Sequence, residues 1–213
     1  MLSQEKDKLR VIPILQQCAL EYQDELLDRN LLVMCSRTPE KRIFYHEFTF
    51  KSNNFAHLTG CYDSKQKQAD RFYEKCVNQK LSPNDIHLAS NGSSRQKLNV
   101  LPKILCKNLS AKMIGDYAGT QPQLETDILA GGTCACIGFK YDRNGSGILR
   151  PNTVLQGNLS TYVKDKAKDP AVVVVDEKGN FDGEHTNAVL SARLKNMENA
   201  VIPGFYGAMP DGS

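Results

Sequence analysis

The sequence predicts an α+β domain in which N-terminal helices pack on a largely antiparallel sheet of about four to six strands. Up to about residue 110, apolar residues mostly recur every three or four positions, as on one face of a helix. Beyond that point they alternate at every second position, and glycines separate the short runs. Helices followed by strands, without regular alternation of the two, favour an α+β fold over a parallel α/β sheet.

The composition is that of a globular chain with a mildly basic balance. The 213 residues suffice for one domain with a buried core, and 40% of them are hydrophobic. The net charge of +3 permits a polyanionic partner without requiring one. No apolar run has the length of a membrane span, and the charged first ten residues are unlike a signal peptide. We therefore expect a cytoplasmic protein without a membrane partner.

The cysteine pattern gives no sign of a metal site or a disulfide framework. Seven cysteines are scattered along the chain, and no Cys-x-x-Cys pair occurs among them. In a reducing compartment they are expected to be free thiols, mostly small residues of the core. We expect neither a metal nor another cofactor.

The N-terminal half begins with a helix and a hairpin. Residues 3–30 carry an amphipathic helical pattern, which Pro13 either kinks or divides into two helices. Residues 31–35 and 43–51 are two strand-like runs around a polar turn, with Phe44, His46, Phe48 and Phe50 on the face expected to point to the core. Residues 52–58 then suit a short helix with Ser52 as its N-cap.

Two further helices precede the strand-rich half. Residues 65–80 show an apolar stripe, and Ser82 with Pro83 is typical of a new helical turn, which a brief strand at 86–89 could follow. Residues 94–109 suit a basic helix that Pro102 disturbs. Strands are predicted at 113–117, 124–129, 134–139, 171–175 and 188–193, with a charged segment at 161–169 as a possible short helix.

Several common catalytic motifs are absent. The sequence contains no phosphate-binding loop, no dinucleotide-binding glycine turn, no zinc-binding His-Glu-x-x-His and no Gly-x-Ser-x-Gly elbow. A calcium-loop fragment begins at Asp142, but Thr153 stands where the closing acidic residue is required. Nucleotide hydrolases, dehydrogenases, metalloproteases and serine hydrolases are thereby disfavoured. The polar candidates that remain are His57, Thr59, Lys97, Asp116, Asn152, Thr153, Ser191 and Arg193.

Short motifs in a fixed order resemble the phage-type Barnase–EndoU–colicin–RelE-like (BECR) nuclease domains over roughly residues 25–195. The resemblance rests on these stretches: Phe55-x-His57-Leu58-Thr59-Gly60, Phe72-Tyr73 with Lys80-Leu81-Ser82, Lys97 with a following leucine, Ile114-Gly115-Asp116-Tyr117, Ile137-Gly138-Phe139 and Pro151-Asn152-Thr153. It implies helices packed on a four-stranded antiparallel sheet and metal-independent RNA cleavage. We accordingly expect a helical arm at 1–30, a BECR-like domain at 31–195 and an irregular tail at 196–213.

The implied chemistry assigns roles to the candidates. Cleavage through the 2′-hydroxyl needs a base, an acid and a cation or donors on the phosphate, and histidine titrates near working pH. His57 is the expected base or acid, Lys97 or Arg193 the cation, and Thr59, Thr153 and Ser191 the hydroxyl donors. Each has a plainer alternative: His57 could cap or pack a helix, Lys97 could lie on a solvated face, and Thr153 could serve only a turn. A second histidine could come from His87 or His185.

Two functions are favoured over a third, which is another transferase or hydrolase chemistry on the same fold. One is an RNA-cleaving toxin or effector of a phage or other mobile element in a bacterial cell. The other is a catalytically inactive protein of the same fold that binds and inhibits a host defence component, with the N-terminal helix as a docking or homodimerisation element.

Overall fold

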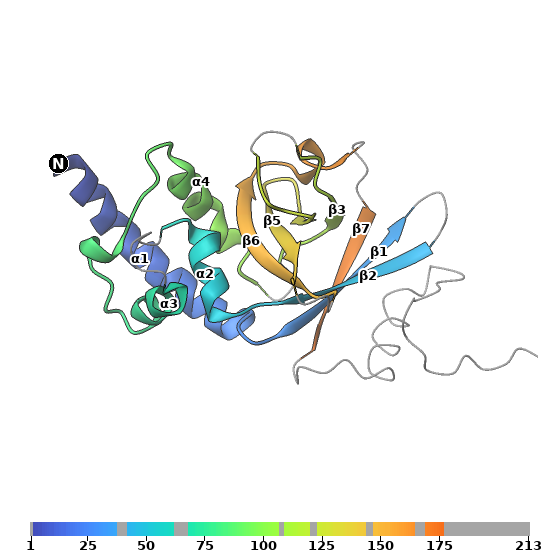
Figure 1. Ribbon diagram of the computed structural model, residues 1–213, viewed down its shortest axis with the longest axis horizontal. Coiled ribbons are helices and arrows are strands. Elements are labelled where there is room, and N and C mark those ends of the chain that lie inside the picture. Colours follow the sequence, from blue (N-terminus) through green and yellow to red (C-terminus); the bar gives the residue numbers. More distant parts are fainter. Residues whose placement is uncertain are drawn as a thin grey trace, which may run out of the picture.

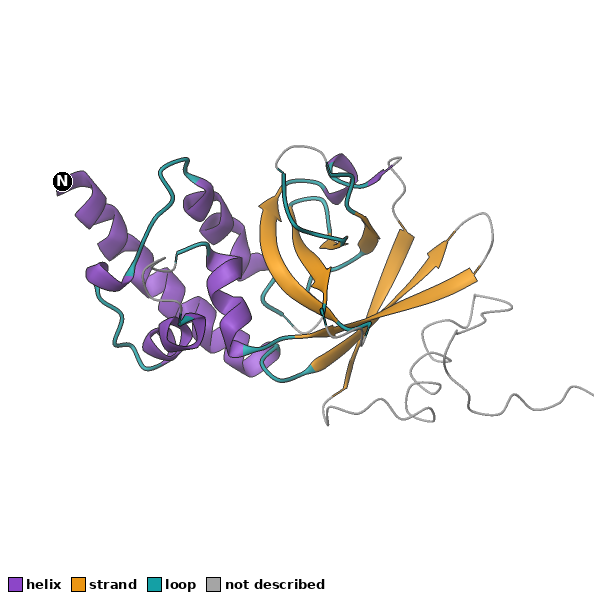
Figure 2. Ribbon diagram, in the orientation of Figure 1, coloured by secondary structure: helices purple, strands orange, loops and turns teal. Residues whose placement is uncertain are grey.

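The computed structural model places helices at one end of the molecule and strands at the other (Figures 1 and 2). It describes residues 2–37, 42–61, 68–106, 109–119, 123–143, 147–164 and 169–176. The α+β class with N-terminal helices and a largely antiparallel sheet is confirmed. The predicted strand at 188–193 and the tail at 196–213 lie outside the described residues.

The first helix is longer than any other described helix and belongs to the core. Helix α1 spans Leu2–Glu25 as one helix with Pro13 inside it, so this proline does not divide it. Its stripe of Leu15, Cys18 and Tyr22 is fully buried in the main hydrophobic cluster, which strands and the other helices share. None of the helices in the described part of the chain has the length and hydropathy needed to cross a membrane.

The remaining α-helices are short and lie at the same end of the molecule as α1 (Figure 1). They are α2 (Ser52–Thr59), α3 (Ala69–Val77) and α4 (Ser93–Val100), with 3-10 turns η1 (Pro83–Asp85), η2 (Leu101–Lys103) and η3 (Leu159–Thr161). The predicted helix at 94–109 stops at Val100 because Pro102 has no backbone N–H to donate and the chain tightens into η2. The brief strand predicted at 86–89 is wrong, since this segment pairs with no strand of the described sheet.

The sheet closes on itself as a barrel in the order β1-β2-β6-β5-β4-β3-β7. Its strands are β1 (Asn30–Arg37), β2 (Arg42–Thr49), β3 (Met113–Asp116), β4 (Ile128–Gly131), β5 (Ala135–Tyr141), β6 (Leu149–Gln156) and β7 (Asp169–Asp176). The predicted hairpin of β1 and β2 is confirmed, with Asn30 opposite Thr49. Every pairing is antiparallel except the short contact between β2 and β6.

Strand β6 is an element that the sequence analysis did not predict. Pro151 lies inside it, and a proline interrupts the alternation by which strands are recognised. The register explains how it fits: Thr153 lies opposite Gly138 while Pro151 lies opposite Phe139, so Asn152 is the extra residue of a β-bulge. Strand β4 also begins later than predicted, at Ile128 instead of residue 124.

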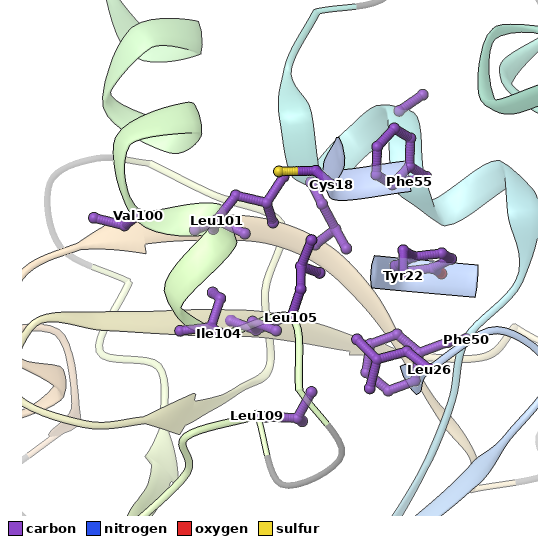
Figure 3. Close-up of a cluster of buried hydrophobic side chains, with 14 of the residues drawn as sticks. Cys18, Tyr22, Leu26, Phe50, Phe55, Val100, Leu101, Ile104, Leu105 and Leu109 are labelled. Carbon is purple, nitrogen blue, oxygen red and sulfur yellow. The ribbon is translucent and has the colours of Figure 1, made fainter. Parts of the chain in front are cut away.

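Two hydrophobic clusters lie on opposite faces of β5 and β6. The larger contains Ile137 and Val154 together with the helices, and the smaller contains Cys136 and Leu155 together with the segment after β6. Adjacent residues on a strand point to opposite faces, which explains the division. Tyr22 belongs to the larger cluster (Figure 3). Its ring lies edge-on to those of Phe50, Phe55 and Tyr73, at centroid distances of 5.4–6.1 Å. Its hydroxyl donates to the Lys51 carbonyl at 2.8 Å.

The turn between β4 and β5 offers a matched test of packing. A Cβ at Gly131 would lie 2.5 Å from both the Ala135 oxygen and the Cys136 Cα, whereas one at Gly132 would meet only the Ser110 oxygen at 3.6 Å. We expect Gly131→Ala to lower the free energy of unfolding by about 2 kcal/mol or more. Gly132→Ala should change it by about 0.5 kcal/mol or less. Urea unfolding measures both, and equal effects would contradict this account of the turn.

Candidate functional site at the end of helix α2

Helix α2 is held in place by its apolar side and presents His57 on its other side. Phe55 and Leu58 are fully buried, while His57 is exposed. At the first turn, Lys51 N donates to Asn54 Oδ1 and Asn54 N donates to the Lys51 carbonyl, each at 2.9 Å. Lys51 is thus the N-cap, and the prediction of Ser52 in that position was one residue late.

The C-terminal end of α2 is closed by groups from helix α4. Gly60 ends the helix in the left-handed conformation, with φ of 64°, and its N–H donates to the Ala56 carbonyl. Lys97 Nζ donates to the His57 carbonyl at 2.9 Å, and Ser94 Oγ donates to the Gly60 carbonyl at 2.7 Å. Carbonyls at the C-terminal end of a helix lack intrahelical partners, and a cation there also interacts favourably with the helix dipole.

Gly60 is favoured by space as well as by its backbone angle. A Cβ at this position would lie 3.2 Å from Lys97 Cδ and 3.7 Å from Nζ. The lysine side chain therefore passes close to the glycine, and a Cβ here would require that side chain to shift by a few tenths of an ångström, in addition to the strain of the left-handed backbone.

The Lys97 ammonium disfavours a positive charge on His57. The imidazole is exposed, but neighbouring protein atoms partly desolvate it and lower the pKa of His57 from its ordinary value of 6.5, and the nearby Lys97 ammonium lowers it further. Burial also lowers the pKa of Lys97 from 10.5, although the Cys61 thiol opposes this shift. The neutral imidazole is favoured at neutral pH, and this is the form that can accept a proton.

Thr59 was predicted to donate its hydroxyl to the phosphate of a substrate, but its surroundings differ from those that this role requires. It is fully buried, and its hydroxyl donates to the Ala56 carbonyl at 3.0 Å and accepts from Cys61 N at 3.2 Å. This hydroxyl therefore completes the end of α2 and does not reach the surface beside His57.

Thr153 lies on the other face of β6 from the helices. It is 3% exposed and opposes Gly138 in the register, with the neighbouring Val154 in the cluster that contains the helices. Its Oγ1 and that of Thr126 are buried without a hydrogen-bond partner among the described residues. Both methyl groups would lie 2.8 Å from a Cβ at Gly138. The structure thus joins His57 with Lys97, while Thr153 belongs to a separate threonine pair.

The other candidates are distributed over the molecule. Asp116 is exposed at the end of β3, and Asn152 donates from Nδ2 to the Glu125 carbonyl at 2.8 Å. His87 is exposed on the loop before α4. The predicted Ser191, Arg193 and His185 lie outside the described residues.

Sequence reasoning did not select Ser94, although it joins two elements of the site. Its hydroxyl accepts from Ala89 N at 2.9 Å while it donates to Gly60, and the residue is buried. The available signal was its place two residues after Gly92 of the Asn91-Gly92 turn, at a helix start, which predicts a capping role but not a contact with α2.

The described chain has an α+β fold that combines N-terminal helices with a closed, largely antiparallel sheet. The chain belongs to the family of phage-Barnase-EndoU-ColicinE5/D-RelE like nuclease 4 (PBECR4), whose model matches residues 14–190. The resemblance inferred from the motifs is thereby confirmed, and it supports a nuclease-type function in broad terms. Comparisons with curated proteins and with solved structures gave no significant match.

Within the described residues, no three side chains of His, Cys, Asp or Glu are grouped so that they could hold a metal ion. The cysteines described there are free, and Cys18, Cys61, Cys76 and Cys136 are buried. Burial raises the pKa of each of these four thiols to about 12, so they are inert core residues at neutral pH.

The His57–Lys97 pair predicts a measurable titration. Lys97→Gln removes the ammonium that disfavours the imidazolium, so the pKa of His57 should rise but stay below 6.5 because burial remains. NMR of the four histidines measures it, with His57→Gln to assign the signal. Lys80→Gln is the control, because Lys80 is exposed and does not contribute to the shift. An unchanged His57 titration in Lys97→Gln would contradict the coupling.

Proposed function

We propose that the protein cleaves RNA without a metal, in a bacterial cell that carries the phage or mobile element encoding it. The observation that supports this most directly is the exposed His57 held neutral beside the Lys97 cation at the end of α2. A neutral imidazole and an ammonium are the base and the phosphate cation that this reaction needs. The family provides the nuclease-type context.

The proposed reaction starts at the 2′-hydroxyl of the substrate. His57 accepts its proton, the 2′-oxygen attacks the adjacent phosphorus, and the bond to the 5′-oxygen breaks. The products are a 2′,3′-cyclic phosphate and a 5′-hydroxyl, whose proton comes from a general acid or from water. Lys97 has three N–H donors and uses one on the His57 carbonyl, so two remain to stabilise the phosphate charge.

Not all of the other predicted site residues keep a role in the proposed reaction. Arg193 and Ser191 stay predicted contributors to phosphate binding. Thr59 and Thr153 are buried, and the structure gives them no route to a phosphate at His57.

The proposal is tested with short single-stranded and structured RNAs in the presence of EDTA. Wild type should form 2′,3′-cyclic phosphate ends, and His57→Gln should be slower by about 100-fold or more, the usual contribution of a general base. Lys97→Gln should also be slower, whereas Lys80→Gln should retain the wild-type rate. Thermal unfolding of each variant controls for folding.

The pH dependence of kcat/KM gives a second readout of the same residue. Because the pKa of His57 is lowered, the acid limb should have its midpoint below pH 6.5 and move to higher pH in Lys97→Gln. Cleavage that survives His57→Gln would transfer the base role to another residue. Cleavage abolished by EDTA and restored by a divalent cation would contradict metal independence.

Non-enzymatic binding of a host defence protein is the second candidate function. Leu9 and Ile14 on α1 are 55% and 40% exposed, and in this hypothesis they are the apolar side chains through which α1 contacts a partner or a second copy. Leu9→Lys with Ile14→Lys would then abolish binding of the host target or dimerisation without changing RNA cleavage. A wild-type protein that cleaves no RNA but inhibits a defence system through this surface would favour this function.

A further inference from the structure

An open pocket of about 590 Å³ lies where three segments meet: η2, the chain before β3 and the β4–β5 turn. This volume is within the range of ligand-binding pockets in proteins. None of the residues assigned to the proposed reaction lines it.

The rim of the pocket is cationic. Lys103 and Lys112 come from different segments and are both exposed, and the exposed Thr133 adds a hydroxyl. No carboxylate occurs among the described residues that line it, and neither lysine forms an ion pair within the described part of the chain. Two ammonium groups without a competing carboxylate favour an anion, and lysine binds phosphate well as a point charge.

The floor of the pocket is apolar. Ile104 and Ala135 are buried and Met113 is half-buried, and all three line the pocket. A nucleic-acid strand presents phosphates and flat bases side by side. A cationic rim above an apolar floor matches both parts, whereas inorganic phosphate would use only the rim.

Hydrogen bonds fix the walls before any ligand arrives. Ser110 Oγ donates to the Lys103 carbonyl at 2.9 Å, and Lys112 N donates to the Gly131 carbonyl at 2.9 Å. Gly132 N donates to the Ala135 carbonyl at 3.0 Å and closes the turn. A site whose walls are already ordered loses little conformational entropy on binding.

One wall also has an unusual backbone. Leu109 and Ser110 have φ of 53° and 45°, a left-handed conformation that a branched residue such as leucine rarely adopts. Leu109 is fully buried at the edge of the main cluster (Figure 3), and this packing holds the conformation. Such outliers concentrate at functional sites, and this one adjoins the pocket.

We propose that this pocket binds a nucleotide unit of a single-stranded RNA, with Lys103 and Lys112 on its phosphates and the apolar floor against a base. The identity of the ligand rests on the proposed RNA cleavage, but the site is separate from His57. It would hold a part of the substrate strand away from the cleaved bond.

Binding is measured by fluorescence anisotropy with a 2′-O-methyl RNA of about ten nucleotides, which lacks the attacking hydroxyl and suits the usual site sizes for single strands. Lys103→Gln with Lys112→Gln should weaken binding by about tenfold or more. The slope of log K against log salt should fall by about 1.4, or 0.7 for each lost phosphate contact. Lys80→Gln is the control and should bind as wild type.

Cys134 supplies a local probe because it is exposed and lines the pocket. Its alkylation by N-ethylmaleimide, followed by peptide mass spectrometry, should slow at least several-fold when the 2′-O-methyl RNA is bound. Cys106 provides an internal comparison, since it is half-buried and does not line the pocket. Lys80→Gln should keep the protection of Cys134.

The outcomes separate this proposal from the proposed function. Wild-type affinity in the double lysine variant, or an unchanged alkylation rate of Cys134 with RNA, overturns the pocket even if the protein cleaves RNA. Lysine-dependent binding with protection of Cys134 supports the pocket even if no RNA is cleaved, and the proposed reaction then fails alone. Absence of any binding by the wild type overturns the pocket as well.

Discussion

The carbonyl groups at the end of α2 impose the constraint on which the candidate site depends. A helix of eight residues leaves a large share of its carbonyls without intrahelical partners. Lys97 and Ser94 supply two of the missing partners from α4, and Gly60 suits this position because it adopts the left-handed backbone and leaves space beside the lysine. One set of contacts therefore fixes the angle between two helices and brings a cation to the backbone of His57.

That arrangement has an electrostatic consequence. A lysine drawn into a partly buried position to complete a helix end is itself desolvated, and it lowers the pKa of the adjacent imidazole. The structural role and the proposed catalytic role of Lys97 are thus not alternatives. The same hydrogen bond that stabilises α2 keeps the ammonium close enough to favour neutral His57, and it leaves two N–H groups to act elsewhere.

The sequence predicted those elements of the structure that have local signals and missed those in which such signals are interrupted or absent. The β1–β2 hairpin and the η1 turn were predictable because alternation and cap residues are local signals. Strand β6 was not, because Pro151 and the bulge at Asn152 break the period within the strand itself. In the site, the sequence left open whether His57 packs or is exposed, and the structure shows it exposed beside the buried Phe55 and Leu58. The burial of Thr59 could not be predicted either, since its partners on Ala56 and Cys61 are backbone groups that no side-chain pattern reveals.

The modest net charge of the chain is a poor guide to whether it can bind a polyanion, because ion pairs are distributed unevenly over the part of the chain that the structure describes. Of the described acidic residues, these are paired with a lysine or arginine: Asp7, Asp28, Asp85, Glu125 and Asp142. Each such pair is locally neutral and contributes little to the field beyond a Debye length. Within residues 97–112, in contrast, the hydrogen bond that Lys97 forms in the described part of the chain is to a carbonyl, and Lys103 and Lys112 lie at a pocket whose described lining has no carboxylate. A short stretch of chain can therefore present a positive surface that a total of +3 conceals, and this local distribution is what a phosphate would encounter.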